Sequence, residues 1–307
     1  MSVAWTASGV RARALLNRRV GAVGARALST RATLADALAT LEAGPYQREV
    51  RAGQSLEEAE HGVSATVLWH LRVLAGWLPR AGAEAMRLLA GWFEVANVLE
   101  LLRSLHGAEA GPAYRLGTLA TAWPRLSTAA SAEQLRSLLA ASPWGDPGTD
   151  TPWGTATAIR LGWATRLAAG IPQTRPWAAG GVALVVARDR YVLSRPVPEP
   201  AARRARAAFG VDADTRIPFT AFAHALPNDA RWALEDVERP EDLWRAEERW
   251  WARVERDALA ALRRPRYGLA PAVGCVVLLA IDARRVRAAL ELAARGGRPE
   301  EAFDALA

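Results

Sequence analysis

Apolar and polar positions follow the period of an α-helix over most of the chain. The clearest stretch is 82–105, where apolar side chains recur at spacings of three and four residues. This seam consists of Ala85, Leu88, Trp92, Val95, Leu99 and Leu102. Another face carries the polar residues Arg87, Glu94, Asn97 and Ser104. Such spacing predicts a helix that packs along one side, and Gly107 followed by Gly111-Pro112 marks its end.

A similar pattern recurs 188 positions further on, where Asp282 takes the place of Glu94. The corresponding seam is Val273, Val276, Ala280, Ala283, Arg287 and Leu290. Each helix is followed by a glycine-containing break and a second helical start, at 112–119 and at 299–306. The pattern predicts an internal repeat of helical units, with 177–193 as a weaker intermediate copy. Chance similarity between two alanine- and leucine-rich helices is the alternative.

Proline and glycine divide the rest of the chain into further helices. The stretch 142–148 holds two prolines and two glycines and predicts a loop, and 195–200 predicts an extended linker. Pro240 opens a charged amphipathic helix that runs to about Arg264. Its apolar side consists of Trp244, Trp251, Val254, Ala258 and Leu262. We therefore predict an all-α chain of helical bundles joined by short loops.

Composition supports the helical prediction and removes several kinds of chemistry. Alanine makes up about a fifth of the 307 residues, and 51% of them are hydrophobic, which suffices for a packed core. All 39 basic residues are arginine, so a phosphate-loop lysine and a Schiff-base lysine are excluded. The net charge of +7 predicts attraction to an acidic protein, an anionic lipid or a nucleic acid. Cys275, the single cysteine, stands in an apolar run and is expected to be a buried, unreactive thiol.

We find no motif that predicts catalysis, a cofactor or a metal. No Gly-x-Ser-x-Gly sequence is present, and aspartates stand close together only at Asp212 and Asp214. The histidines, which lack the spacing of a zinc site, are His61, His70, His106 and His224. The acidic cluster 57–60 could hold magnesium, but Ser55 followed by Glu58 favours a helix capping box.

Thirteen tryptophans interleaved with arginine are compatible with stacking on single-stranded nucleic acid. A core role is favoured for those that occupy apolar helical positions, which are Trp69, Trp77, Trp92 and Trp251. The start of the chain lacks the pattern of a signal peptide. The longest apolar run, 269–281, is shorter than the ~20 residues of a membrane span, so we expect none.

Several motifs, taken in order, resemble the C/d family of V-type/A-type ATPase central-stalk proteins, also called the AC39 family. At the amino end these are 17–20, 25–28 and 34–38, followed by Tyr46. The stretch 93–103 is similar to the family's acidic-x-x-Asn-Leu…Leu-Arg helix. At the carboxyl end they are 267–268, 282–287 and 297–301. The sequence departs from the family pattern at 153–239, and Arg285 stands where the family has asparagine.

The resemblance implies one C/d-like domain over 1–307. Three similar helical subdomains, at about 1–80, 81–195 and 196–307, would form a funnel with pseudo-threefold character. Such a protein is a non-catalytic central-stalk subunit on the cytoplasmic face of the membrane, peripheral to it. It would link the D/F-type shaft to the proteolipid c/K-type ring and couple ATP hydrolysis or synthesis to proton or sodium transport. No nucleic acid, cofactor, metal or membrane span is implied.

Two groups of residues follow from this resemblance. We predict that the shaft is contacted by Arg18, Arg19, Arg284 and Arg287, because they lie on the two motif helices that flank the presumed cup. The family motif assigns structural roles to Glu94, Asn97, Arg103 and Asp282. The alternatives are a basic all-helical nucleic-acid-binding protein, whose binding would fall steeply with salt, and an enzyme with an unrecognised pocket.

Overall fold

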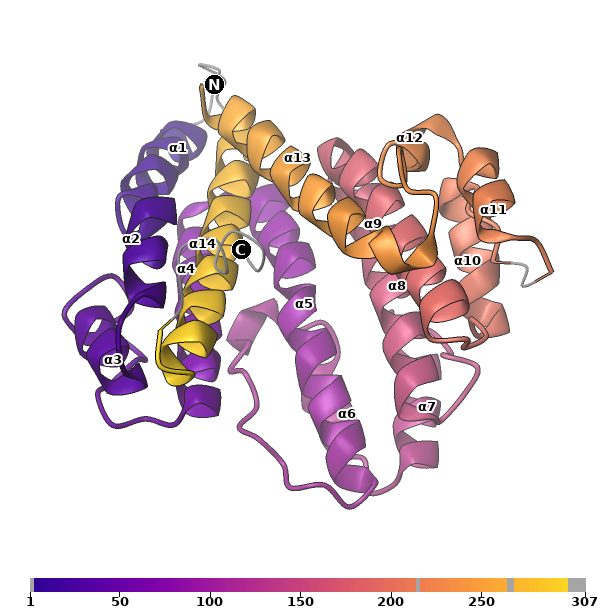
Figure 1. The fold of residues 1–307 in the computed structure, drawn as a ribbon, viewed down its shortest axis with the longest axis horizontal. Coiled ribbons are helices and arrows are strands. Elements are labelled where there is room, and N and C mark those ends of the chain that lie inside the picture. Colours follow the sequence, from indigo (N-terminus) through magenta and orange to yellow (C-terminus); the bar gives the residue numbers. More distant parts are fainter. Residues whose placement is uncertain (1–2, 214–215, 264–267, 298–307) are drawn as a thin grey trace. The chain divides into compact units, whose positions relative to one another are not determined.

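The computed structural model describes residues 3–213, 216–263 and 268–297 (Figure 1). These residues form helices and loops with no strand among them, which confirms the predicted all-α fold. The helices are α1 Val3–Leu16, α2 Gly21–Ser29, α3 Leu34–Glu42, α4 Leu56–Trp77, α5 Arg80–Leu105, α6 Trp123–Leu126, α7 Ala132–Ala140, α8 Pro152–Gly170, α9 Arg175–Ala187, α10 Glu199–Phe209, α11 Phe219–Ala225, α12 Asn228–Arg231, α13 Leu243–Arg263 and α14 Leu269–Ala294. Short turns lie at Gly117–Leu119, Pro172–Thr174, Arg188–Val192 and Pro240–Asp242.

Most predicted boundaries agree with these helices, but the second helical start predicted at 112–119 is wrong, because only the short turn Gly117–Leu119 forms there. The seam at 82–105 lies within α5, and the charged helix predicted from Pro240 is a short turn followed by α13. The linker predicted at 195–200 ends at Pro198, because α10 begins at Glu199 and accepts a proline in its first turn. The second helical start predicted at 299–306 lies outside the described residues, as do the motif residues 267 and 298–301.

The chain divides into two compact units. One unit comprises Met1–Met86 and Glu255–Ala307, and the other comprises Arg87–Val254. Helices α5 and α13 each begin in one unit and end in the other. The arrangement of three subdomains in a funnel stays a prediction.

The first unit is built around the last described helix, α14. This helix packs against α1, α2, α3 and α4, so the two ends of the sequence share one core (Figure 1). It is apolar on nearly all sides, and its buried residues include Val273, Leu279, Val286 and Leu290. A helix that is apolar all round must be covered on most faces, which explains its central place. Cys275 is fully buried within it, and burial raises the pKa of its thiol to about 12.

The second unit has two clusters of buried apolar side chains. One joins α5, α6, α7 and α8 through residues that include Val98, Leu126, Leu139 and Ile159. The other joins α8 to the segment 178–246 and includes Val182, Phe209 and Phe222. Trp144 lies in the predicted loop 142–148, yet it is 3% exposed and belongs to the first cluster.

The predicted core role is wrong for two tryptophans on helix surfaces. Trp77 is 51% exposed and Trp92 is 48% exposed, whereas Trp69 and Trp251 are half-buried. Trp244, expected on the apolar side of its helix, is also 51% exposed. The Arg11 guanidinium lies 3.8 Å from the Trp77 ring centroid, and the Trp92 ring lies 5.4 Å from that of Trp163. Trp77 and Trp92 thus lie at the surface, where a cation–π contact and a ring contact replace packing in the core.

Candidate functional site

Asp282 of α14 binds the start of α2. Its carboxylate accepts hydrogen bonds from the backbone N–H groups of Val20, at 3.1 Å, and Gly21, at 2.7 Å. The Tyr46 hydroxyl donates a third hydrogen bond to it at 2.9 Å. Burial and the adjacent carboxylate raise the pKa of Tyr46 well above its usual value, so the phenol keeps its proton and remains a donor. Asp282 is 3% exposed, and these donors replace the water that it loses.

Glu94 of α5 binds the start of α6 in the second unit, as Asp282 binds the start of α2 in the first. Its carboxylate accepts from the backbone N–H groups of Thr121, at 2.6 Å, and Ala122, at 2.8 Å, where α6 begins. The third donor is the Trp144 indole, at 2.7 Å. Arg166 lies 4.8 Å from the Trp144 ring centroid, and its positive charge interacts favourably with Glu94. Glu94 has no exposed surface.

The two acids therefore make the same kind of contact in each unit. Each lies on a long helix, receives two consecutive backbone N–H groups at the start of another helix, and receives one polar hydrogen from an aromatic side chain. We call each set a carboxylate clamp, one at Asp282 and one at Glu94. A buried carboxylate that lost these donors would destabilise its unit by about 3–5 kcal/mol. This pairing agrees with the sequence displacement that aligned the two acids.

The other motif residues have distinct contacts. Asn97, which is 2% exposed, donates to the Tyr114 carbonyl at 2.9 Å and accepts from the Tyr114 N–H at 2.7 Å. Arg285, at the corresponding place in α14, instead forms two hydrogen bonds with Glu255 of α13, at 2.8 and 2.7 Å. Arg103 is exposed and donates to the Glu100 carboxylate and to the Glu109 carbonyl.

The predicted partner-binding arginines all lie in the first unit near the Asp282 clamp. Arg18 and Arg19 lie in the connection between α1 and α2, not on a helix as predicted, whereas Arg284 and Arg287 follow Asp282 on α14. Arg18 and Arg287 are exposed, whereas Arg19 and Arg284 are half-buried. Arg19 donates to the Leu16 carbonyl at 3.1 Å. The clamp thus brings the two motif segments together, and whether these arginines bind a partner stays a prediction.

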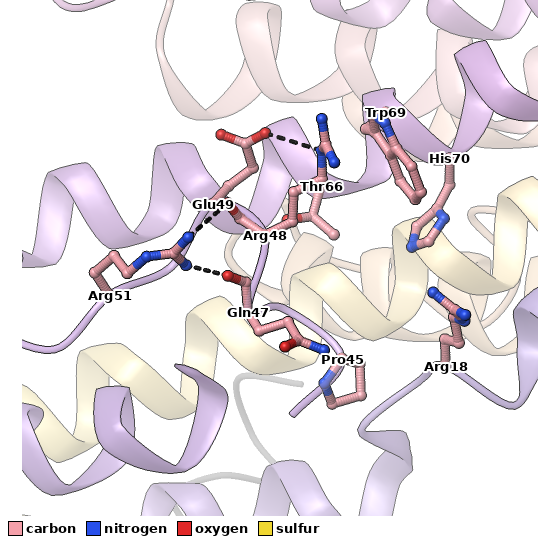
Figure 2. Close-up of a pocket in the computed structure, with 9 residues that line it drawn as sticks. All are labelled: Arg18, Pro45, Gln47, Arg48, Glu49, Arg51, Thr66, Trp69 and His70. Carbon is pink, nitrogen blue, oxygen red and sulfur yellow. Dashed lines mark hydrogen bonds and ion pairs between the residues drawn. The ribbon is translucent and has the colours of Figure 1, made fainter. Parts of the chain in front are cut away.

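A cavity of about 480 Å³ lies beside these residues in the first unit (Figure 2). Its lining includes Arg18, Arg48, Arg51, Thr66 and His70. Arg48 pairs with Glu49 at 3.4 Å, and its guanidinium lies 4.5 Å from the ring centroid of Trp69. Arg51 donates to the carbonyls of Gln47 and Val50, which holds the loop between α3 and α4.

His70 is buried at this cavity, as is Thr66. His70 is 3% exposed, and its Nδ1 has no contact with solvent and no hydrogen-bond partner. Burial, with the charges of Arg18 and Arg48, lowers the pKa of His70 to about 4. The imidazole is therefore neutral at physiological pH.

The described residues contain no arrangement that suggests a metal site. No group of three histidine, cysteine, aspartate or glutamate side chains within that part of the chain could hold a metal ion. The acidic cluster at 57–60 begins α4, where Ser55 and Glu58 form the predicted capping box. In the same described ranges, no helix has the length and apolarity required to cross a membrane.

Comparison with known proteins finds no protein family that matches the chain and no curated protein that matches it.

Sequence reasoning missed the aromatic partners of the clamps and the basic cavity. The sequence pattern places Tyr46 only in the family motif and Trp144 only in a loop. A tryptophan between proline and glycine in an otherwise polar loop, as at 143–145, is the signal that could have revealed a buried role. The cavity had no such signal, because its residues come from three separate segments.

Proposed function

We propose that this chain is a non-catalytic central-stalk subunit of a V/A-type rotary ATPase, of the C or d kind. In this role it would join the rotating shaft to the membrane proteolipid ring, at the cytoplasmic face. Torque transmitted through it would couple ATP hydrolysis or synthesis to proton or sodium transport.

The repeated carboxylate clamp is the observation that supports this proposal most directly. The motif that carries the family resemblance includes an acid at 94 and at 282, and in both places the acid is buried and holds the start of a second helix. A coupling part must transmit strain without deforming, and close-packed helices fixed by buried hydrogen bonds meet that need. The exposed Arg18 and Arg287 beside the Asp282 clamp, together with the net charge of +7, suit an acidic partner.

Co-purification tests the proposal. We expect the tagged full chain, isolated from detergent-solubilised membranes of its own cells, to recover shaft and ring subunits in fixed proportion. Arg287→Glu should lower that recovery by roughly tenfold or more, because it places a negative charge where an acidic partner would bind. Arg125→Glu is the matched control, because Arg125 is also exposed but belongs to the second unit, and it should leave the recovery of ATPase subunits unchanged.

Three outcomes would contradict the proposal. One is recovery of no ATPase subunit, and another is ATP hydrolysis by the isolated chain. The third is recovery of nucleic acid whose binding falls by orders of magnitude between low and moderate salt, which would favour the nucleic-acid alternative. Far-UV circular dichroism of both variants would show that each remains folded.

A further inference from the structure

The cavity at His70 has the chemistry of an oxyanion site, and this inference does not rest on the proposed function. We propose that it binds a phosphate group, either as free phosphate or as part of a larger molecule. The residues that would hold the phosphate are Arg18, Arg48 and His70.

The first argument is the charge that surrounds the cavity. Three arginines line it, against one acid, Glu49. Arg48 already faces Glu49, and Arg51 is engaged with loop carbonyls and lies 3.9 Å from Glu42. Arg18 has no carboxylate partner among the described residues, so its charge is left to attract an anion. A guanidinium group matches a phosphate with two parallel hydrogen bonds, which an ammonium group cannot do.

The second argument is the unsatisfied imidazole of His70. Figure 2 shows this ring beside Trp69 and facing the guanidinium of Arg18. A buried polar group without a partner destabilises the folded state, and such groups are uncommon in folded proteins. The neighbouring arginines disfavour a proton on the ring, whereas an anion between them would favour one. An oxyanion would therefore supply the missing acceptor and offset the positive charges of Arg18 and Arg48.

The size of the cavity and its aromatic wall restrict the ligand. A volume of about 480 Å³ exceeds that of a phosphate ion and falls within the range of small-molecule sites. The Arg48 guanidinium covers the Trp69 indole, and the His70 ring meets it edge-on at 4.9 Å. A nucleotide base would have to displace Arg48 to stack there. Free phosphate, or a phosphate ester that needs no stacking surface, fits better.

The experiment measures the NMR chemical shifts of the His70 ring nitrogens. The full-length chain, labelled with ¹⁵N at histidine, is titrated with inorganic phosphate at neutral pH, with sodium chloride adjusted to keep ionic strength constant. We expect a saturable shift of the His70 ring nitrogens and little change at His224, which lies in the second unit. Chloride alone at the same ionic strength should leave His70 unchanged.

Variants distinguish this site from general attraction by a basic protein. Arg18→Gln should weaken phosphate binding by roughly tenfold or more, whereas Arg125→Gln should leave it as in the unmodified chain. Arg18 is exposed, so its replacement should not unfold the protein, and the histidine spectrum would verify this. Equal affinity in both variants would overturn the proposal.

A final arm separates the two sources of phosphate. Flotation with phosphatidylcholine vesicles, with and without phosphatidic acid, measures binding to a lipid phosphate. Binding that requires phosphatidic acid and is lost in Arg18→Gln, without binding of free phosphate, would identify a lipid headgroup as the source. Absence of saturable binding in both arms would overturn the proposal.

Discussion

At the scale of single residues, burial shifts the pKa of several ionisable groups and so determines which of them carry a proton. Tyr46 and Cys275 keep their protons because burial raises the pKa of each. His70 is the opposite case, because burial among arginines lowers its pKa and keeps it unprotonated. A histidine of this kind makes folding sensitive to acid.

We expect the stability of the chain to fall as the pH is lowered from about 6.5 to about 4. His70 has a folded-state pKa of about 4, below the usual 6.5, so within this window the unfolded chain binds a proton that the folded chain does not. Stability is therefore full above the unfolded pKa and is lost as the pH falls towards the folded one, by about 3 kcal/mol for this group. Urea unfolding at a series of pH values would measure the loss.

The matched variants are His70→Gln and His224→Gln. The first removes the buried imidazole and should flatten the pH dependence in that window, whereas the second changes an exposed histidine and should keep it. If His70→Gln and the unmodified chain lose stability in parallel, the imidazole is not held neutral by its surroundings. His61, whose pKa burial also lowers, remains in both variants and contributes equally to each.

At the scale of helices, the packing of α13 against α14 depends on Gly274. A Cβ atom added there would lie 2.7 Å from the backbone carbonyl oxygen of Ala258 on α13. Backbone cannot move aside as a flexible side chain can, so the two helices would have to separate. We expect Gly274→Ala to destabilise the chain by about 1–3 kcal/mol.

Gly76 in α4 provides the control for this substitution. A Cβ at Gly76 meets nothing within 4 Å, so Gly76→Ala should be neutral or should stabilise the chain, by up to about 1 kcal/mol. Chemical denaturation of the two variants compares the same change in two helices of one protein. Equal stabilities would show that α13 and α14 tolerate a wider spacing than the structure has.

The helices could be predicted because their signals are local. The seam of α5 and the capping box of α4 each depend on residues within a few turns of one another. The same periodicity does not predict which side of a helix is covered by neighbouring helices. For this reason the core role predicted for Trp77 and Trp92 is wrong. A helical wheel separates the faces, and only tertiary packing decides which one is buried.

The candidate sites were predictable only in part, for a related reason. Glu94 and Asp282 correspond by sequence position, but their hydrogen-bond donors come from segments far away along the chain, such as Val20 and Trp144. The basic cavity joins the segment before α2, the loop after α3 and the middle of α4. No spacing rule within one segment could predict that Arg18 and His70 line the same space.

At the scale of the whole molecule, each unit contains its own clamp, so we expect each clamp to stabilise its own unit. Asp282→Asn and Glu94→Gln keep the shape of the side chain but replace one acceptor oxygen by an NH₂ group, which would face a donor. We expect each variant to lose about 2–4 kcal/mol of stability, because a buried N–H is left unpaired and a charge-assisted hydrogen bond is lost. Glu109→Gln, at an exposed acid, should lose little.

Hydrogen exchange, under conditions in which every variant stays folded, would locate the effect. The amides of Val20 and Gly21 should exchange faster in Asp282→Asn, and those of Thr121 and Ala122 should exchange faster in Glu94→Gln, because each pair loses one of its two acceptor oxygens. Each variant should leave the other pair close to its original rate. If either substitution accelerated all four amides equally, the two acids would act through the stability of the entire chain. The prediction that each clamp stabilises its own unit would then be wrong.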